Sequence, residues 1–313
     1  MGAASHADGE RETTMFEPLH GLNTAIFTPF DDNGNVDIGR FEALLNWQID
    51  VGVTGFFVCG STGEGLYLSP EERRLMAEAA VQIVAGRAAV MVHVGSNTTA
   101  QSVELAKHAQ DVGADAVSSI APVYYQLGFE ATLGHYKAIG SATDLPFFIY
   151  HIPHLTGAAL TADSAGRLSE VPNLAGLKFT DPALYLMRWV FELTGRRFTM
   201  LSGPDELHLP ALTMGAHGAI GTTYNIMPAA FLRLREAFFS GDMERAMYLQ
   251  ARCNQIIYVM LQFGGIPAFK ATMKLVGYDC GDPRGPIPTL SPDQEAELHG
   301  RLRKAGIEEL TSL

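Results

Sequence analysis

Lysine and cysteine are both scarce in this chain of 313 residues, which contains six lysines and three cysteines. The cysteines, Cys59, Cys253 and Cys280, are odd in number and widely separated, so they form neither a disulfide framework nor a C-x-x-C metal motif. Cys59 ends an apolar run, where we expect a reduced and buried thiol. No run of about 18 apolar residues is present, which excludes a helix that spans a bilayer and therefore a membrane partner.

Basic residues are also in short supply relative to acidic ones. The sequence contains 22 lysines and arginines against 34 aspartates and glutamates, which gives a formal net charge of -12. A surface of this sign repels phosphate groups, so we exclude nucleic acid as a partner. The segment 1–14 is polar and lacks the apolar core of a signal peptide. We therefore expect residues 1–15 to form a flexible leader and the protein to be cytoplasmic.

What the sequence does contain is a regular alternation of short apolar runs with longer amphipathic segments. The apolar runs are 22–27, 55–59, 90–94, 116–120, 147–150, 174–177, 198–201 and 218–221. They show little polar alternation, which is typical of parallel strands buried on both faces. Between and after them the apolar spacing predicts helices. These helices are 37–51, 69–85, 99–112, 130–142, 163–170, 182–194, 205–215 and 228–240.

Eight strand–helix units predict an α/β fold, a (β/α)₈ TIM barrel over residues 16–240. The rival fold, a doubly wound open sheet, would have fewer strands and a glycine-rich turn after the first one. Here the first strand ends in Thr28-Pro29-Phe30 instead. After Gly241 only helices are predicted, over 242–263, 267–276 and 291–304. Residues 241–313 should therefore form a helical extension packed against the barrel or a neighbouring subunit.

The functional prediction depends on one lysine, Lys178. Active sites of such barrels lie at the carboxyl ends of the strands, and Lys178 alone among the lysines ends an apolar strand. Burial disfavours the ammonium form and lowers its pKa, and a neutral amine can attack a ketone to form a Schiff base. The alternative is a lysine that only neutralises a carboxylate at the barrel top. The other lysines are expected on solvated helix faces: Lys107, Lys137, Lys270, Lys274 and Lys304.

Two tyrosines at preceding strand ends favour the catalytic interpretation. Tyr150 ends the strand before that of Lys178 and should lie beside it. Tyr124, one strand further back, could extend a relay, because a phenol can donate or accept a proton at short range. The alternative for either tyrosine is core packing with a satisfied hydroxyl group.

The loop 60–65, with the sequence Gly-Ser-Thr-Gly-Glu-Gly, is a candidate anion site. Its glycines permit close backbone approach, and the amides and hydroxyls of Ser61 and Thr62 can bind a carboxylate. It lacks the lysine of a P-loop and departs from G-x-G-x-x-G at Thr62, so we exclude a nucleotide; the alternative is a plain strand–helix turn. His151 and His154 have no obvious carboxylate or cysteine ligand in their loop, so we predict no metal and no cofactor.

Four motifs together resemble the dihydrodipicolinate synthase / N-acetylneuraminate lyase family of Schiff-base aldolases, from about residue 21 to the end of the chain. The motifs are Gly60-Ser61-Thr62-Gly63-Glu64, Tyr150-His151-Ile152-Pro153 with Thr156-Gly157, Gly176-Leu177-Lys178-Phe179-Thr180-Asp181, and Gly218-Ala219-Ile220-Gly221-Thr222-Thr223-Tyr224-Asn225. The resemblance implies that Lys178 forms the Schiff base with pyruvate, that Tyr150 is the acid/base, and that Ser61 and Thr62 hold the carboxylate. It also implies that Tyr124 is lent to a neighbouring subunit, within a homotetramer built as a dimer of dimers.

Residues around these motifs distinguish the branches of the family. In the synthase branch an arginine two residues after the proline of Tyr-x-x-Pro binds the second carboxylate of the aldehyde substrate. Leu155 occupies that position here, which disfavours dihydrodipicolinate synthase. The lyase branch is more similar, and its Asp-Glu pair would bind the hydroxyls of a sugar-acid tail; the residues implied are Gly203, Asp205, Glu206, Thr180 and Thr222. The alternative role of the two acidic residues is to place negative charge at the N-terminus of the next helix.

We therefore predict reversible cleavage of N-acetylneuraminate to N-acetylmannosamine and pyruvate, in which the iminium on Lys178 stabilises the carbanion left when the C3–C4 bond breaks. His154 and Pro204 differ from what a dedicated sialic acid lyase would have, so a second hypothesis is an aldolase or dehydratase of another 2-keto-3-deoxy sugar acid. A third is a non-catalytic barrel that binds a keto acid, against which the retained lysine and tyrosines argue. In each case the partner is a small keto acid.

Overall fold

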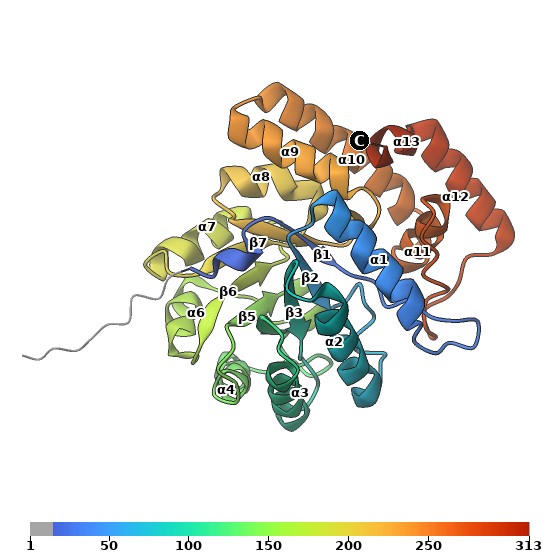
Figure 1. Cartoon of the computed structure of the whole chain (residues 1–313). Helices are drawn as coiled ribbons and strands as arrows, with labels where there is room; N and C mark the ends of the chain where they lie inside the picture. The colour runs from blue at the N-terminus through green and yellow to red at the C-terminus, as the bar shows by residue number, and fades with distance from the viewer. Residues whose placement is uncertain (1–14, 313) are drawn as a thin grey trace, which may run out of the picture.

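Eight parallel strands close into a barrel in chain order, with β1 paired to β8 (Figure 1). The computed structural model describes residues 15–312, and residues 1–14 of the expected leader lie outside them. The strands are β1 (Leu22–Ala25), β2 (Gly55–Val58), β3 (Ala89–His93), β4 (Ala116–Ser119), β5 (Phe147–His151), β6 (Leu174–Phe179), β7 (Thr199–Ser202) and β8 (Gly218–Gly221). The predicted TIM barrel is confirmed.

Helices surround the barrel and follow their strands as the apolar spacing predicts. They are α1 (Ile38–Val51), α2 (Pro70–Val84), α3 (Thr99–Asp111), α4 (Phe129–Gly140), α6 (Ala162–Gly166), α7 (Leu184–Leu193), α8 (His208–Thr213) and α9 (Pro228–Ser240). Two predicted helices are divided: α6 continues into the 3₁₀ turn η2 (Arg167–Glu170), and η3 (Asp205–Leu207) precedes α8. Three short elements were not predicted: the helix α5 (Pro153–Thr156) and the 3₁₀ turns η1 (Glu17–Leu19) and η4 (Thr223–Asn225).

Local capping explains where the longer helices begin. At α2 the Ser69 side chain accepts a hydrogen bond from the Glu72 backbone N–H, and the Glu72 carboxylate accepts one from the Ser69 backbone N–H. Ser291 and Gln294 form the same capping box at the start of α12 (Pro292–Ala305). Each box satisfies two backbone donors that the first helical turn leaves without partners.

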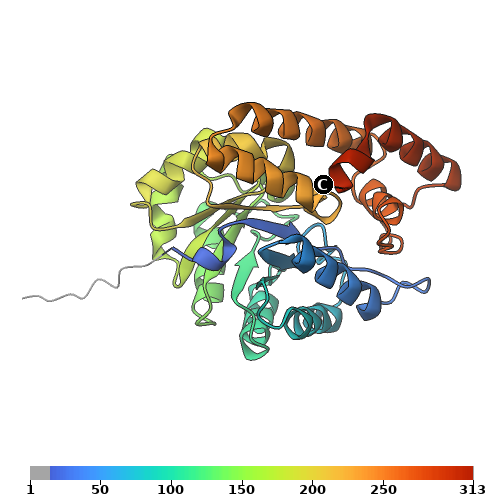
Figure 2. The ribbon, with the colours of Figure 1, turned by 45° about the horizontal axis from the view of Figure 1, so that its top comes forward.

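The chain after α9 is helical, as predicted. It forms α10 (Met243–Leu261), α11 (Ile266–Leu275), α12 and the unpredicted α13 (Ile307–Thr311), which lie together on one side of the barrel alongside α9, orange to red in Figures 1 and 2. Among the described residues no single helix is long and apolar enough to cross a membrane. The pair α10 and α11 meets that test only together, across a bend of 115°.

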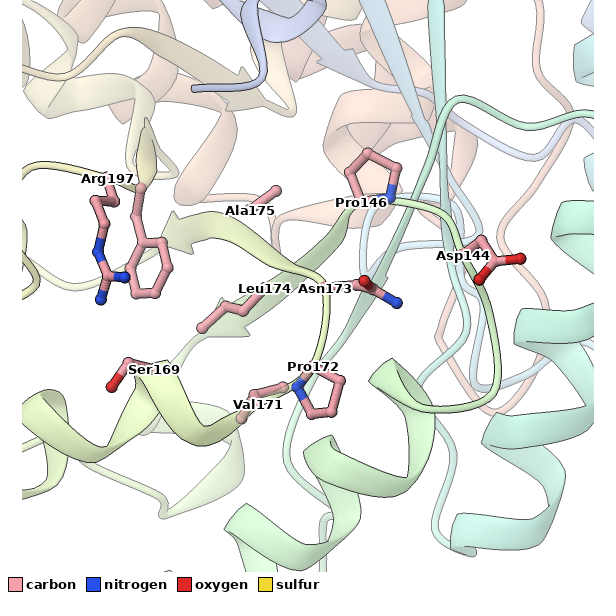
Figure 3. Close-up of a pocket in the computed structure, with 10 residues that line it drawn as sticks. Asp144, Pro146, Ser169, Val171, Pro172, Asn173, Leu174, Ala175 and Arg197 are labelled. Carbon is pink, nitrogen blue, oxygen red and sulfur yellow. The ribbon is translucent and has the colours of Figure 1, made fainter. Parts of the chain in front are cut away.

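Residues from Phe16 to Leu19 lie at the bottom of the barrel, the end where the strands begin. Phe16 packs against Phe148 inside the barrel, and its N–H donates to Thr199 at the start of β7. A cavity of about 450 Å³ lies at this same end, lined among others by Asp144, Asn173 and Arg197 (Figure 3). None of the predicted site residues lines it, and this face of a TIM barrel serves stability rather than catalysis.

Candidate active site

Lys178 lies inside the barrel near the end of β6, directly beside Tyr150 of β5, with which it is paired in the strand register. Its Nζ is 4.1 Å from the centroid of the Tyr150 ring and 4.2 Å from that of Phe57 on β2. Only 3% of Lys178 is exposed. The predicted proximity of Lys178 to Tyr150 is thus confirmed, and the amine faces two aromatic rings rather than bulk water.

Burial has a large effect on the protonation of this amine. It lowers the pKa of Lys178 from 10.5 to about 7, and the nearby carboxylate of Asp205 opposes that decrease. At pH 7 about half of the Lys178 amines are then neutral, against roughly one in 3000 for an ordinary lysine. The neutral amine is the form that attacks a ketone.

The Tyr150 hydroxyl connects this amine to the loop 60–65. Its oxygen is 3.4 Å from Ser61 Oγ. Burial raises the pKa of Tyr150, and the hydroxyls of Ser61 and Thr180 act in the opposite direction. Tyr150 is therefore a phenol at neutral pH and can donate a proton to a group bound over Lys178.

His93 on β3 completes the aromatic surroundings as a neutral ring, 6.0 Å from the Tyr150 ring. Its Nδ1 donates to the carbonyl of Cys59 at 3.1 Å, and its Nε2 accepts from the N–H of Ile120 at 3.3 Å. Burial, followed by the charges of Arg73 and Lys178, lowers the pKa of His93 well below 6.5. Neither His93 nor Phe57 was predicted from the sequence as part of the site, although both occupy inward positions of their strands.

The loop 60–65 is folded tightly against the strand ends. Thr62 Oγ1 lies 2.6 Å from Thr222 Oγ1, which links the loop to the end of β8. Gly65 is required because a Cβ there would come within 1.8 Å of the carbonyl oxygen of Cys59. The structure thus brings Ser61 and Thr62 to the same end of the barrel as Lys178. The thiol of Cys59 is free and buried as expected, and burial raises its pKa to about 11.

A cavity of about 280 Å³ opens beside this group, at the ends of β6, β7 and β8. It is lined by His154, Thr180, Pro182, Gly203, Pro204, Asp205, Glu206, Thr222, Thr223, Ile257 and Phe269. Lys178 and Tyr150 do not line it; Thr180, two residues beyond Lys178, does. Gly203 must be glycine, because a Cβ there would meet Thr180 Oγ1 at 1.8 Å. All five residues predicted to bind a sugar tail therefore line one cavity.

One carboxylate oxygen of Asp205 already accepts hydrogen bonds from within the protein. Its Oδ2 accepts from both the N–H and the hydroxyl of Thr223, each at 2.7 Å, while its buried Oδ1 has no hydrogen-bond partner. Burial raises the pKa of Asp205 to about 7, against the hydrogen bonds from Thr223. Asp205 thus holds the turn after β8, and its unpaired Oδ1 is buried, while Glu206 is only half-buried.

Tyr124 is not brought to Tyr150 within the chain. It is 87% exposed, and its ring meets the edge of Tyr125 at 4.9 Å between centroids. The intrachain relay considered from the sequence is therefore wrong. Tyr124 also has a φ of 81°, an unfavourable backbone conformation for a bulky residue. An exposed aromatic side chain of this kind is available for a contact with another subunit.

The burial of Lys270 contradicts a second expectation. The sequence placed it on a solvated helix face, but it is 1% exposed and forms an ion pair with Glu64 at 2.7 Å. The part of α11 from Pro267 to Met273 is buried all around, so helical spacing alone could not identify a solvent face. Within residues 15–312 no three His, Cys, Asp or Glu side chains are grouped to hold a metal ion.

A closed (β/α)₈ barrel with a buried lysine near its carboxyl-terminal mouth is the architecture of the class I, Schiff-base aldolases. The sequence matches the Dihydrodipicolinate synthetase family over residues 18–305, and the chain belongs to that family. It is accordingly a pyruvate-dependent carbon–carbon lyase of the dihydrodipicolinate synthase and N-acetylneuraminate lyase type.

Relatives of both types are similar to this chain to nearly the same degree. N-acetylneuraminate lyase from Mediterraneibacter gnavus is 34% identical over 295 residues, which cover 92% of this chain and 93% of that protein. 4-Hydroxy-tetrahydrodipicolinate synthase from Exiguobacterium sp. is 33% identical over 279 residues, covering 89% and 95%. The solved structure of a catalytic lysine mutant of Ruminococcus gnavus sialic acid aldolase superposes with a TM-score of 0.89 at 32% identity, covering 95% and 99%. Overall similarity thus does not distinguish a lyase substrate from a synthase substrate.

Proposed function

We propose that this enzyme cleaves N-acetylneuraminate reversibly to N-acetylmannosamine and pyruvate. The observation that carries the proposal is the charge of the cavity beside Lys178: its lining contains Asp205 and Glu206 but no lysine or arginine. A second carboxylate on an aldehyde substrate would meet a negative field there, whereas a polyhydroxylated tail would meet hydrogen-bond acceptors. Leu155, at the position where a synthase would have arginine, agrees with this choice.

In the proposed reaction the neutral amine of Lys178 attacks the keto carbon of the open-chain sugar acid and gives a carbinolamine. Tyr150 donates its phenolic proton to the departing hydroxyl, so that water leaves and an iminium and a phenolate remain. The phenolate then takes the proton of the C4 hydroxyl as the C3–C4 bond breaks. The electrons of that bond pass into the iminium, which releases the aldehyde and leaves an enamine of pyruvate on Lys178.

The substrate carboxylate is proposed to bind the loop 60–65. Ser61 and Thr62 supply amides and hydroxyls there, and the contact of Ser61 with Tyr150 keeps the carboxylate close to the reacting carbon. The tail then extends toward Glu206, along the cavity that Asp205, Thr180 and Thr222 also line. Gly203 leaves room for the Thr180 hydroxyl beside it.

A direct test is pyruvate release from N-acetylneuraminate, measured beside pyruvate release from shorter 2-keto-3-deoxy sugar acids and condensation of pyruvate with aspartate semialdehyde. We expect the highest kcat/KM for N-acetylneuraminate. Condensation as the preferred reaction would overturn the proposal. The second candidate, an aldolase or dehydratase of a shorter sugar acid, is favoured by the volume of about 280 Å³, near the lower end of ligand pockets.

We further propose a cytoplasmic homotetramer, a dimer of dimers, in which residues 16–240 form the catalytic barrel and 241–313 its helical extension. Two separate apolar surfaces support this assembly: Tyr124 with Tyr125, and an exposed stripe of Tyr185, Trp189 and Leu193 along α7. Replacing Tyr124 with arginine should weaken one interface and leave the other. Sedimentation should then detect dimers, and unchanged tetramers would contradict the role of Tyr124.

A further inference from the structure

A buried ion pair lies directly behind the loop that carries Ser61 and Thr62. Oε1 of Glu64, in the loop, is 2.7 Å from Nζ of Lys270, on α11, and the two side chains are 0% and 1% exposed. A charge pair withdrawn from water is costly unless further polar contacts complete it. Such a pair therefore requires partners around it, and its geometry is fixed by them.

The surrounding backbone provides those partners. Nζ of Lys270 donates to the carbonyl of Thr28 at 3.0 Å and to that of Asp282 at 3.3 Å. The other oxygen of the Glu64 carboxylate accepts from the N–H of Arg284 at 2.7 Å. The ion pair thus joins the segment after β1, the loop 60–65, α11 and the segment that follows α11.

The same contacts fix the backbone immediately after Thr62. The Thr28 hydroxyl donates to the carbonyl of Gly63 at 2.7 Å, so the residue held by Lys270 in turn holds the loop. Glu64 itself has a φ of 54°, a left-handed conformation that costs energy in a residue other than glycine. Such a conformation persists only where the surrounding structure determines it. The ion pair is one of the contacts that hold Glu64, and with it the loop, in this conformation.

We propose that Glu64 and Lys270 are positioning residues, which hold Ser61 and Thr62 of the loop at the place where the substrate carboxylate binds. In this way α11 takes part in binding the substrate carboxylate through the loop. The inference rests on the proposed function in one respect, the assignment of the carboxylate to this loop. Neither residue touches the reacting atoms.

The expected consequence concerns binding more than chemistry. A carboxylate is present in pyruvate, in the enamine and in the transition states between them, so a weaker loop contact loses binding energy in all of them alike. Loss of such uniform binding raises KM and leaves kcat nearly unchanged. A purely structural role would lower the melting temperature without changing the KM of the protein that remains folded.

The test uses exchange of the pyruvate methyl protons with deuterated water, catalysed by the full-length enzyme. This exchange passes through the enamine on Lys178 and needs no sugar substrate. The variants are Glu64→Gln, Lys270→Met and the combination of both, with Lys270→Arg as the charge-preserving change. Lys274→Met is the matched control, because Lys274 lies one turn further along α11 and pairs with Glu295 near the surface.

We expect Glu64→Gln and Lys270→Met each to raise the KM for pyruvate by about tenfold or more, with kcat within about threefold. The double variant should have a KM no higher than that of the more impaired single variant, because both substitutions remove one shared contact. Lys270→Arg should recover part of the loss, and Lys274→Met should match the wild type.

An unchanged KM in the folded variants would overturn the inference. If the single variants do not fold, the double variant decides, because it removes both buried charges together; a wild-type KM in that protein refutes a positioning role. Failure of the proposed function is seen in a different measurement, the comparison of substrates, because an enzyme that prefers condensation or a shorter sugar acid would still exchange the methyl protons of pyruvate through the same enamine.

Discussion

The pH dependence of Schiff-base formation follows from the burial of Lys178. With a pKa of about 7, roughly one tenth of the amines are neutral at pH 6 and roughly nine tenths at pH 8. The rate of attack on pyruvate should therefore rise about tenfold between pH 6 and pH 8 and reach a plateau above pH 8. A lysine with the ordinary pKa of 10.5 would give a rise of about a hundredfold over the same interval and no plateau.

The assay is the rate of imine formation in a rapid-mixing experiment, at pyruvate concentrations well below saturation, so that the profile reports the free enzyme. Asp205→Asn provides the second measurement. The carboxylate of Asp205 favours the ammonium form of Lys178, so its removal should lower the pKa and move the acid limb to lower pH. A rate that keeps rising up to about pH 10, or a rise that moves to higher pH in Asp205→Asn, would refute the reasoning.

Three further predictions concern single side chains. The folded-state pKa of Lys178 lies below its unfolded value, so wild-type stability should rise with pH between about 7 and 10.5. Lys178→Met has no amine to titrate, so its free energy of unfolding by urea should fall relative to that of the wild type by roughly 5 kcal/mol across that window. Tyr150→Phe keeps the ring beside Nζ but loses the proton donor, so kcat should fall about 10²- to 10⁴-fold in the cleavage assay while pyruvate is still trapped. Leu155→Arg adds a cation at a site that is 58% exposed, and it should introduce condensation with aspartate semialdehyde; no gain would count against the branch assignment.

The barrel could be predicted from the sequence because its strands are buried on both faces. Each strand therefore appears as an uninterrupted apolar run, and the observed strand ends differ from the predicted ones by no more than two residues. The helix expected over 205–215 is divided into η3 and α8, since Pro210 has no N–H to donate to the carbonyl of Glu206, which accepts from Asn254 instead. Gly166 similarly ends α6 within the segment expected as one helix.

The order of strands around a barrel also made part of the site predictable. Consecutive strands are neighbours, so Tyr150 had to lie beside Lys178 once both were assigned to strand ends. The Glu64–Lys270 pair was not predictable, because it joins a loop to a helix far along the chain and neither partner has a distinctive local pattern. The exposure of Tyr124 likewise depends on the path of its loop, which the sequence does not determine.

The central claim is that Lys178 forms a Schiff base, and reduction with borohydride in the presence of pyruvate tests it most directly. Peptide mass analysis should find one reduced pyruvate adduct per chain, on Lys178, and none on Lys270, whose amine is held in an ion pair with Glu64. Lys178→Met should take up no pyruvate. A wild-type enzyme that traps no pyruvate, or traps it on another lysine, would contradict the account.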